Sequence, residues 1–205
     1  MIGVKRLANE SKKAPLYDEL IDKAIEVFST KGYAATNLTD ITDELGVSRG
    51  PVYYHFKDKL GLYKAAYEKF ERGLREIHNQ VFAKDAPIMD LMEEMICRFV
   101  NHIARYEMNF FFMIDGIEEI SEIAECYHKM NQDLYDDKIR MLKEAQIKGE
   151  ISNDISPKEI VDYVYLVYFG ILNGKTSTIL CNYTETEVRQ MTALLFKGIR
   201  NRCEC

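Results

Sequence analysis

The sequence predicts an all-α protein in which a small N-terminal helix-turn-helix domain precedes a larger helical domain. Apolar residues recur at intervals of three and four along most of the chain, which is the spacing of an amphipathic helix. Proline is rare, with 4 residues in 205, and no segment alternates cleanly between apolar and polar residues as a half-buried strand would. The chain length is sufficient for one large domain or two modest ones.

The first three helices are short and closely spaced. An apolar stripe of Ile21, Ala24, Ile25 and Phe28 predicts a helix from about Leu16 to Thr30, which Lys31-Gly32 ends. A second helix is expected after Thr36, as its N-cap, and runs to Leu45 before Gly46. Ser48 is the expected cap of a third helix, which has Pro51 in its first turn and ends near Phe56.

Longer helices follow in the remainder of the chain. Asp58 is expected to cap a helix over 59–81, and the later patterns predict helices near 88–105, 107–114, 121–148, 157–180 and 184–202. We therefore expect a basic N-terminal extension over 1–15, a helix-turn-helix domain over 16–62 and a helical domain over 63–205.

The composition indicates the cellular location, the state of the cysteines and the distribution of charge. No uncharged apolar run is long enough to cross a membrane, and the polar start of the chain lacks the apolar core of a signal peptide, so the expected location is the cytoplasm. The five cysteines are expected to be free thiols, with a redox or metal role for Cys203 and Cys205 left open. Residues 1–60 carry nine basic and nine acidic residues, so the whole net charge of −6 lies in the remainder. A charge-balanced N-terminal part can still present a basic face to DNA.

The segment from Gly32 to Lys59 carries the functional signal. Its two short helices and glycine-containing turn form a helix-turn-helix pattern, whose second helix enters the major groove of DNA. Arg49 has the donors to read guanine, Pro51 offers an apolar face to a thymine methyl, and Lys59 lies at a helix N-terminus that suits a phosphate. Each residue taken singly is equally compatible with a core, capping or solvated role. The candidate DNA contacts are Thr36, Ser48, Arg49, Gly50, Pro51, Tyr53, Tyr54, His55 and Lys59.

This segment resembles the TetR family of one-component transcriptional regulators over about residues 17–66. The matching residues are Phe28, Gly32-Tyr33, Thr36, Ile41, Gly46-Val47-Ser48-Arg49-Gly50, Val52-Tyr53, His55-Phe56 and Lys59. A departure is Leu60-Gly61, where acidic helix formers are usual, and Gly61 is a candidate flexing point or a neutral change. The resemblance implies a dimeric regulator whose C-terminal domain binds a small effector.

The C-terminal sequence is compatible with both implied roles. The alternative is that these residues only form the monomer core, but the dimer is favoured because the family is dimeric and an operator has two half-sites. Apolar faces of the last two helices predict a four-helix dimer interface that contains Val164, Ile171, Val188, Met191, Leu195 and Ile199. Aromatic residues and methionines predict an apolar cavity with few polar anchors, lined by Met95, His102, Phe110, Phe111, Met113, Tyr165, Tyr168 and Asn173. The expected partners are an operator duplex, a hydrophobic or amphipathic effector and a second copy of the chain.

Two other functions compete with a ligand-responsive regulator. An enzyme is disfavoured because the chain lacks a nucleophile elbow, a P-loop, a Rossmann glycine pattern and an HExxH motif, and no cofactor or metal is expected. Glu125 and His128 have the spacing of a di-iron motif, but no second such pair exists. The alternative is a DNA-binding adaptor that recruits proteins through its acidic C-terminal half and binds no small molecule.

Overall fold

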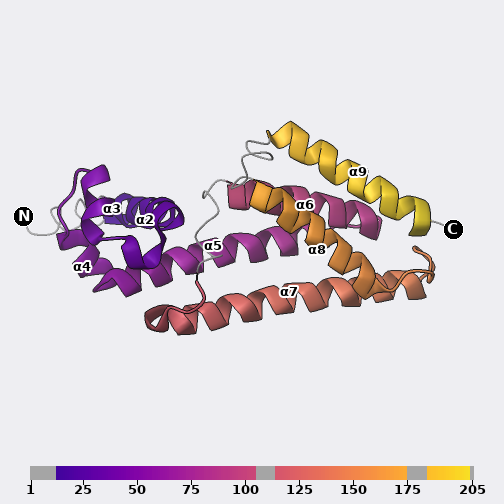
Figure 1. The fold of residues 1–205 in the computed structure, drawn as a ribbon, viewed down its shortest axis with the longest axis horizontal. Helices are drawn as coiled ribbons and strands as arrows, with labels where there is room; N and C mark the ends of the chain where they lie inside the picture. Colours follow the sequence, from indigo (N-terminus) through magenta and orange to yellow (C-terminus); the bar gives the residue numbers. More distant parts are fainter. Residues whose placement is uncertain (1–12, 105–113, 175–183, 204–205) are drawn as a thin grey trace, which may run out of the picture. The chain divides into compact units, whose positions relative to one another are not determined.

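The computed structural model describes residues 13–104, 114–174 and 184–203, and every regular element within these ranges is a helix. The elements are α2 (Lys13–Ala35), α3 (Leu38–Glu44), α4 (Gly50–Phe56), α5 (Lys59–Phe82), α6 (Ile88–Ala104), the 3₁₀ helix η1 (Glu118–Ile120), α7 (Ser121–Ile147), α8 (Pro157–Gly174) and α9 (Glu185–Cys203) (Figure 1). The all-α prediction is confirmed. The first helix begins three residues before the predicted Leu16, and the helix predicted over 107–114 lies almost entirely outside the described residues.

The chain divides into two compact units. The first unit comprises residues 1–72 and 106–127, and the second comprises residues 73–105 and 128–205. The domain boundary predicted after residue 62 therefore falls inside α5, which continues from the first unit into the second. The helix α7 likewise begins in the first unit and continues into the second.

The first unit is organised around the packing of α2 on α3 and α4. Its core side chains include Phe28, Ile41 and Val52, which come one from each of these three helices and are fully buried. Burial of an aliphatic or aromatic side chain of this size contributes roughly 1.5–3 kcal/mol. The helix α2 has non-helical backbone angles at Gly32, where the sequence predicted that it stops.

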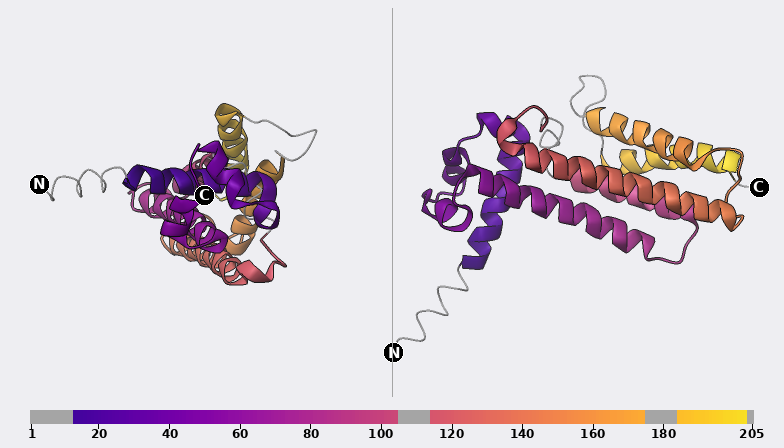
Figure 2. Two further views of the ribbon diagram at one scale, coloured as in Figure 1. Left: turned by 90° about the vertical axis from the view of Figure 1, so that its left-hand side faces the viewer. Right: turned by 90° about the horizontal axis from the view of Figure 1, so that it is seen from below.

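The second unit places α6, α8 and α9 against one another, and Figure 2 shows α8 and α9 side by side. Its core includes Met92 and Met95 from α6, Val161 and Val164 from α8, and Phe196 from α9, all fully buried. Among the residues that the structure describes, no helix is long and apolar enough to cross a membrane.

Candidate nucleic-acid interface

The turn between α3 and α4 sets the angle between the two short helices. Gly46 has a φ of 64°, a left-handed conformation that glycine adopts at little cost. The Val47 N–H then donates to the Thr42 carbonyl at 3.0 Å, which closes the turn. The N-cap of α3 is Asn37 rather than the predicted Thr36, and the Asn37 N–H donates to Asp40 Oδ2 at 2.8 Å. The N-cap of α4 is Arg49 rather than the predicted Ser48.

The helix α4 has one buried face and one exposed face. Val52 and Phe56 are buried against the rest of the unit. Tyr53 and Tyr54 retain 52% and 70% of their surface exposed, which is unusual for aromatic side chains. Ser48, Arg49 and Gly50 are also exposed, whereas Pro51 and His55 are half-buried. Seven of the nine predicted DNA contacts therefore lie in or beside one short, accessible helix.

Positive charge is available at both ends of α4. Arg49 precedes the helix and Lys57 follows it, and both side chains are exposed without an ion-pair partner among the described residues. By contrast, Lys23 is paired with Glu44 at 3.0 Å and Lys31 with Asp40 at 3.0 Å. Unpaired cations beside an exposed helix are suited to phosphate contacts.

The remaining two predicted DNA contacts have internal roles. Thr36 is buried, and its hydroxyl donates to the Gly32 carbonyl at 2.7 Å. The Lys59 ammonium donates to the Tyr33 and Thr36 carbonyls at 3.0 and 3.2 Å, so it stabilises the C-terminal end of α2 rather than standing free for a phosphate. The N-terminus of α5 is capped as predicted, because Asp58 Oδ1 accepts from the Gly61 N–H at 2.8 Å.

Gly61 permits a close approach between the end of α4 and the start of α5. A Cβ atom at this position would lie 1.9 Å from the Phe56 carbonyl oxygen, which is main chain and belongs to α4. Lys57, the residue directly after α4, has a φ of 69°, a strained conformation for a residue with a side chain. This departure from the TetR pattern therefore has a packing reason, and the junction is tight.

Tyr33 connects three parts of the first unit. It is buried, its ring lies 4.9 Å from the ring of Tyr63 of α5, and the Lys59 ammonium lies 4.2 Å from its centroid. Its hydroxyl donates to Glu119 Oε1 of η1 at 2.5 Å. Burial, and next this hydrogen bond to a carboxylate, raise the pKa of Tyr33, so it remains a donor. A groove of about 420 Å³ lies in the same unit and is lined by Phe56, Lys57, Asp58, Leu60, Gly61, Lys64 and residues 118–123.

The predicted effector residues that are described fall in the second unit. Met95 and Tyr168 are buried, and Tyr165 and His102 are half-buried. The Tyr165 ring lies 6.2 Å from the Tyr168 ring, and the His102 imidazole is close enough to Gly73 that a Cβ there would lie 2.3 Å from His102 Cε1. Phe110, Phe111 and Met113, and the side chain of Asn173, lie outside the described part of the chain.

Sequence reasoning missed two polar side chains in the interior of this unit. Lys138 of α7 is 1% exposed and His78 of α5 is 5% exposed. A signal for Lys138 was present: it follows Met130 and Leu134 at intervals of four residues and precedes Leu142 by four, so it occupies an apolar position of α7.

The predicted dimer residues pack mainly inside the protomer. Val164, Val188, Leu195 and Ile199 are buried, Met191 is half-buried, and the side chain of Ile171 lies outside the described part. Among the described side chains of α8 and α9, the large apolar ones that remain exposed are Tyr163, Leu166 and Leu194, with exposed fractions of 52%, 72% and 71%. The spacing of apolar residues identified the helices correctly, but the most regular stripe is the one that closes the core.

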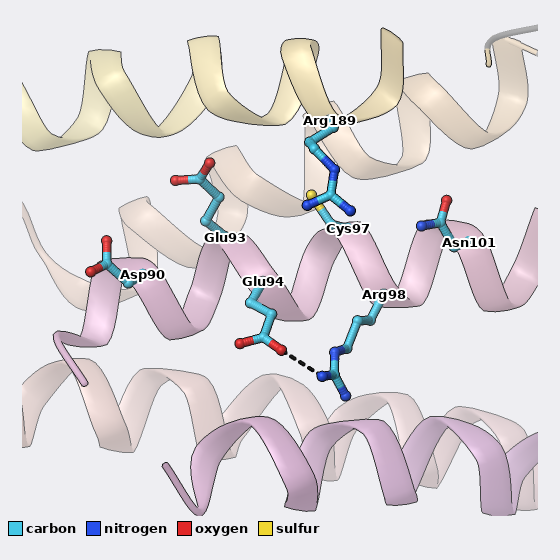
Figure 3. Close-up of a pocket in the computed structure, with 7 residues that line it drawn as sticks. All are labelled: Asp90, Glu93, Glu94, Cys97, Arg98, Asn101 and Arg189. Carbon is cyan, nitrogen blue, oxygen red and sulfur yellow. Dashed lines mark ion pairs between the residues drawn. The ribbon is translucent and has the colours of Figure 1, made fainter. Parts of the chain in front are cut away.

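The described surface of the second unit is hollowed by grooves. One has a volume of about 560 Å³ and lies between α6 and α9, where Arg189 points toward Cys97 and Glu94 pairs with Arg98 at 2.7 Å (Figure 3). Its lining of Asp90, Glu93, Glu94, Cys97, Arg98, Asn101 and Arg189 is mostly charged, unlike the apolar cavity that the sequence predicted. A smaller groove, of about 330 Å³, is lined by Ile155, Glu159, Ile160, Tyr163, Gly198 and Ile199 of the α8–α9 face.

The fold and the exposed face of α4 define a helix-turn-helix DNA-binding protein with a helical second unit. Residues 20–66 match the family model described as bacterial regulatory proteins, tetR family. The chain is 25% identical over 171 residues to the transcriptional repressor BepR of Brucella suis, covering 80% of this chain and 82% of the relative. Residues 20–66 therefore carry the DNA-binding pattern of this family, and the comparisons support a transcriptional regulator.

Solved structures support the fold over almost the whole chain. The fatty acid degradation regulator FadR of Bacillus halodurans is similar with a TM-score of 0.67 at 18% identity, over 91% of this chain and 97% of that one. The ketosteroid transcriptional regulator KstR2 of Mycobacterium tuberculosis is similar with a TM-score of 0.69 at 17% identity, over 89% and 93% of the two chains. At these identities the likeness concerns the fold alone.

Proposed function

We propose that the protein represses transcription as a homodimer that binds a two-fold symmetric operator through α4 and releases it when a small effector binds the second unit. The observation that carries the proposal is the exposed face of α4, with Tyr53 and Tyr54 accessible and unpaired Arg49 and Lys57 at its ends. Arg49 would read a base edge or hold a phosphate, the two tyrosines would contact bases or phosphates, and Lys57 would contact the backbone.

The operator follows from this assignment. Two copies of α4 that read one face of a duplex must lie one helical turn apart, about 34–36 Å, or a multiple of it. Selection of random duplexes by the full-length protein should therefore enrich a sequence whose half-sites are related by two-fold symmetry. Enrichment of a single asymmetric site, or of no sequence at all, would contradict the proposed mode of binding.

The dimer is proposed to form through the outer faces of α8 and α9. Tyr163, Leu166 and Leu194 are exposed there, and the exposed glycines Gly170 and Gly198 would allow partner helices to approach closely. Leu166→Glu would place a charge in this interface and should give a monomer by analytical ultracentrifugation. Ile147→Glu, at another strongly exposed apolar residue on α7, is the matched control and should remain a dimer. A wild-type protein that sediments as a monomer at micromolar concentration would overturn this part.

The effector response is proposed to act through the two helices that continue from one unit into the other. At the first unit, α5 begins beside Phe56 of α4, and η1, just before α7, is hydrogen-bonded to Tyr33. A ligand that changes the position of either helix would change the spacing of the two α4 helices in the dimer. The ligand must prefer the state that does not bind DNA, and a hundredfold preference corresponds to about 2.7 kcal/mol.

The test of the response has two stages. Hydrophobic and amphipathic compounds are first screened for a rise in melting temperature, and operator affinity is then measured with each compound that binds. We expect at least one such ligand to weaken operator binding. If all of the ligands that bind leave operator affinity unchanged, the effector response is wrong and the adaptor function replaces it.

A further inference from the structure

The interior of the second unit contains a lysine whose charge has no counter-ion. The side chain of Lys138 is 1% exposed, on the same face of α7 as the buried Leu134 and Leu142. Its ammonium donates to the Leu134 carbonyl at 2.8 Å and lies 3.3 Å from the Tyr165 hydroxyl. The rings of Phe99 and Tyr165 lie 5.6 and 5.5 Å from it. No carboxylate of the described residues is within 4 Å, although lysine is almost never fully buried without one.

A second polar group is incompletely bonded in the same unit. His78 of α5 is buried, its ring lies 4.8 Å from Phe82, and its Nε2 has no hydrogen-bond partner among the described residues. Burial, and next the charge of Lys138, lower the pKa of His78, so Lys138 acts electrostatically on this imidazole. The charged groups that also act on His78 are Asp137, which raises its pKa, and Arg140, which lowers it. Asp137 is itself paired with Arg140 at 2.9 Å.

The Lys138 ammonium therefore has no anionic acceptor among the described residues. Burial lowers the pKa of Lys138 to about 7, even though Asp137 raises it, because the interior provides no anion for the ammonium. A carboxylate would accept hydrogen bonds from the Lys138 ammonium and neutralise its charge. The ammonium is flanked by the aromatic rings of Phe99 and Tyr165, which suits an apolar body attached to that carboxylate.

We propose that the effector is an amphipathic monocarboxylate whose carboxylate binds the Lys138 ammonium, beside the hydroxyl of Tyr165. This inference rests on the effector response proposed above and specifies its ligand class. If Lys138 had only a structural role in the core, the protein would show no preference for a charged ligand over a neutral ligand of the same shape. Such a preference therefore distinguishes ligand binding from a structural role.

The experiment measures binding of octanoate, dodecanoate and hexadecanoate, and of the matched primary alcohols, to the full-length protein by calorimetry. We expect at least one carboxylate to bind at least tenfold more tightly than its alcohol. Lys138→Met should abolish this preference and leave alcohol binding unchanged or improved. Lys143→Met, at an exposed lysine on the same helix, should behave as the wild type.

A second measurement is the number of protons that the protein takes up when the carboxylate binds. Because the carboxylate would hold Lys138 in its charged form, carboxylate binding near pH 7 should take up about half a proton, detected as a dependence of the binding enthalpy on the buffer. Lys138→Met should lose this uptake, whereas alcohols should show none with either protein. Melting curves recorded without ligand check that the variant is folded.

The outcomes separate the ligand class from the effector response itself. Equal binding of carboxylate and alcohol, absence of binding by all three carboxylates, or wild-type carboxylate affinity in Lys138→Met would each overturn the proposal. If a neutral compound from the melting-temperature screen then releases the operator, the effector response stands and only the carboxylate class fails. If carboxylates bind through Lys138 and the operator stays bound, the ligand site stands and the response fails.

Discussion

Replacement of Lys138 by methionine should stabilise the protein in the absence of ligand, and by an amount that depends on pH. The pKa of Lys138 falls from 10.5 to about 7 on folding, because the ammonium is buried without a counter-ion. One pKa unit corresponds to about 1.36 kcal/mol, so the charged form of this side chain costs the fold on the order of 4–5 kcal/mol. Methionine fills a similar volume without a charge, so most of that cost should disappear.

The sign of the pH dependence follows from the protons bound by each state. Between about pH 7 and pH 10.5 the unfolded chain keeps the Lys138 proton and the folded chain loses it, so stability rises with pH across this window. The wild type should therefore gain about 2 kcal/mol relative to Lys138→Met between pH 7 and about pH 9.

The assay is urea unfolding of both proteins at the two pH values, with Lys143→Met as the exposed control. Taking the difference between variants removes the contribution of groups that titrate equally in both. A methionine variant less stable than the wild type at pH 7, or a stability difference that does not shrink as pH rises, would refute the reasoning from burial.

Three further predictions concern the first unit. Arg49→Ala and Tyr54→Ala should each weaken operator binding by about 1–3 kcal/mol in fluorescence anisotropy without lowering the melting temperature, because both side chains are exposed; unchanged affinity in both would remove α4 from the interface. Gly61→Ala should destabilise the protein by about 1–3 kcal/mol in urea unfolding, since its Cβ would lie 1.9 Å from the Phe56 carbonyl oxygen. Gly50→Ala is the control and should cost less, because its Cβ would lie 3.4 Å from Ser48 Oγ. Equal stability of the two variants would show that the junction between α4 and α5 is not tight. Tyr33→Phe removes the hydrogen bond to Glu119 and should cost about 1 kcal/mol of stability. It should also reduce the loss of operator affinity that a bound effector causes. An unchanged loss of affinity would mean that this hydrogen bond does not transmit the signal.

The helices and the exposed face of α4 were predictable from the sequence because they depend on local patterns. Apolar spacing, Gly46 and Pro51 identified the helix-turn-helix, and the structure exposes Arg49 and Tyr54 as expected. The roles of Thr36 and Lys59 were not predictable, because their hydroxyl and ammonium are bonded to carbonyls at the end of α2, a tertiary arrangement with no sequence signature.

The outward faces of the last helices and the buried lysine were missed for a related reason. Periodicity shows that a helix has an apolar stripe, but it does not distinguish the stripe that closes the core from the side chains left outside, such as Leu166 and Leu194. Lys138 was overlooked because a lysine in a charged helix is ordinarily solvated, and only its register with Leu134 and Leu142 marked it as interior.

Sequence-specific DNA binding through α4 is tested by binding the full-length protein to its selected duplex and to a scrambled duplex over a range of salt concentrations. We expect an affinity for the selected duplex at least about a thousandfold higher than for the scrambled one. Lys57→Ala should weaken binding to both duplexes. It should also reduce the slope of log affinity against log salt concentration by about one for each phosphate that Lys57 neutralises. Lys143→Ala, at an exposed lysine of α7, should change neither the affinity nor the slope. Equal affinity for the two duplexes, or a salt slope that is the same in both variants, would contradict sequence-specific binding through α4.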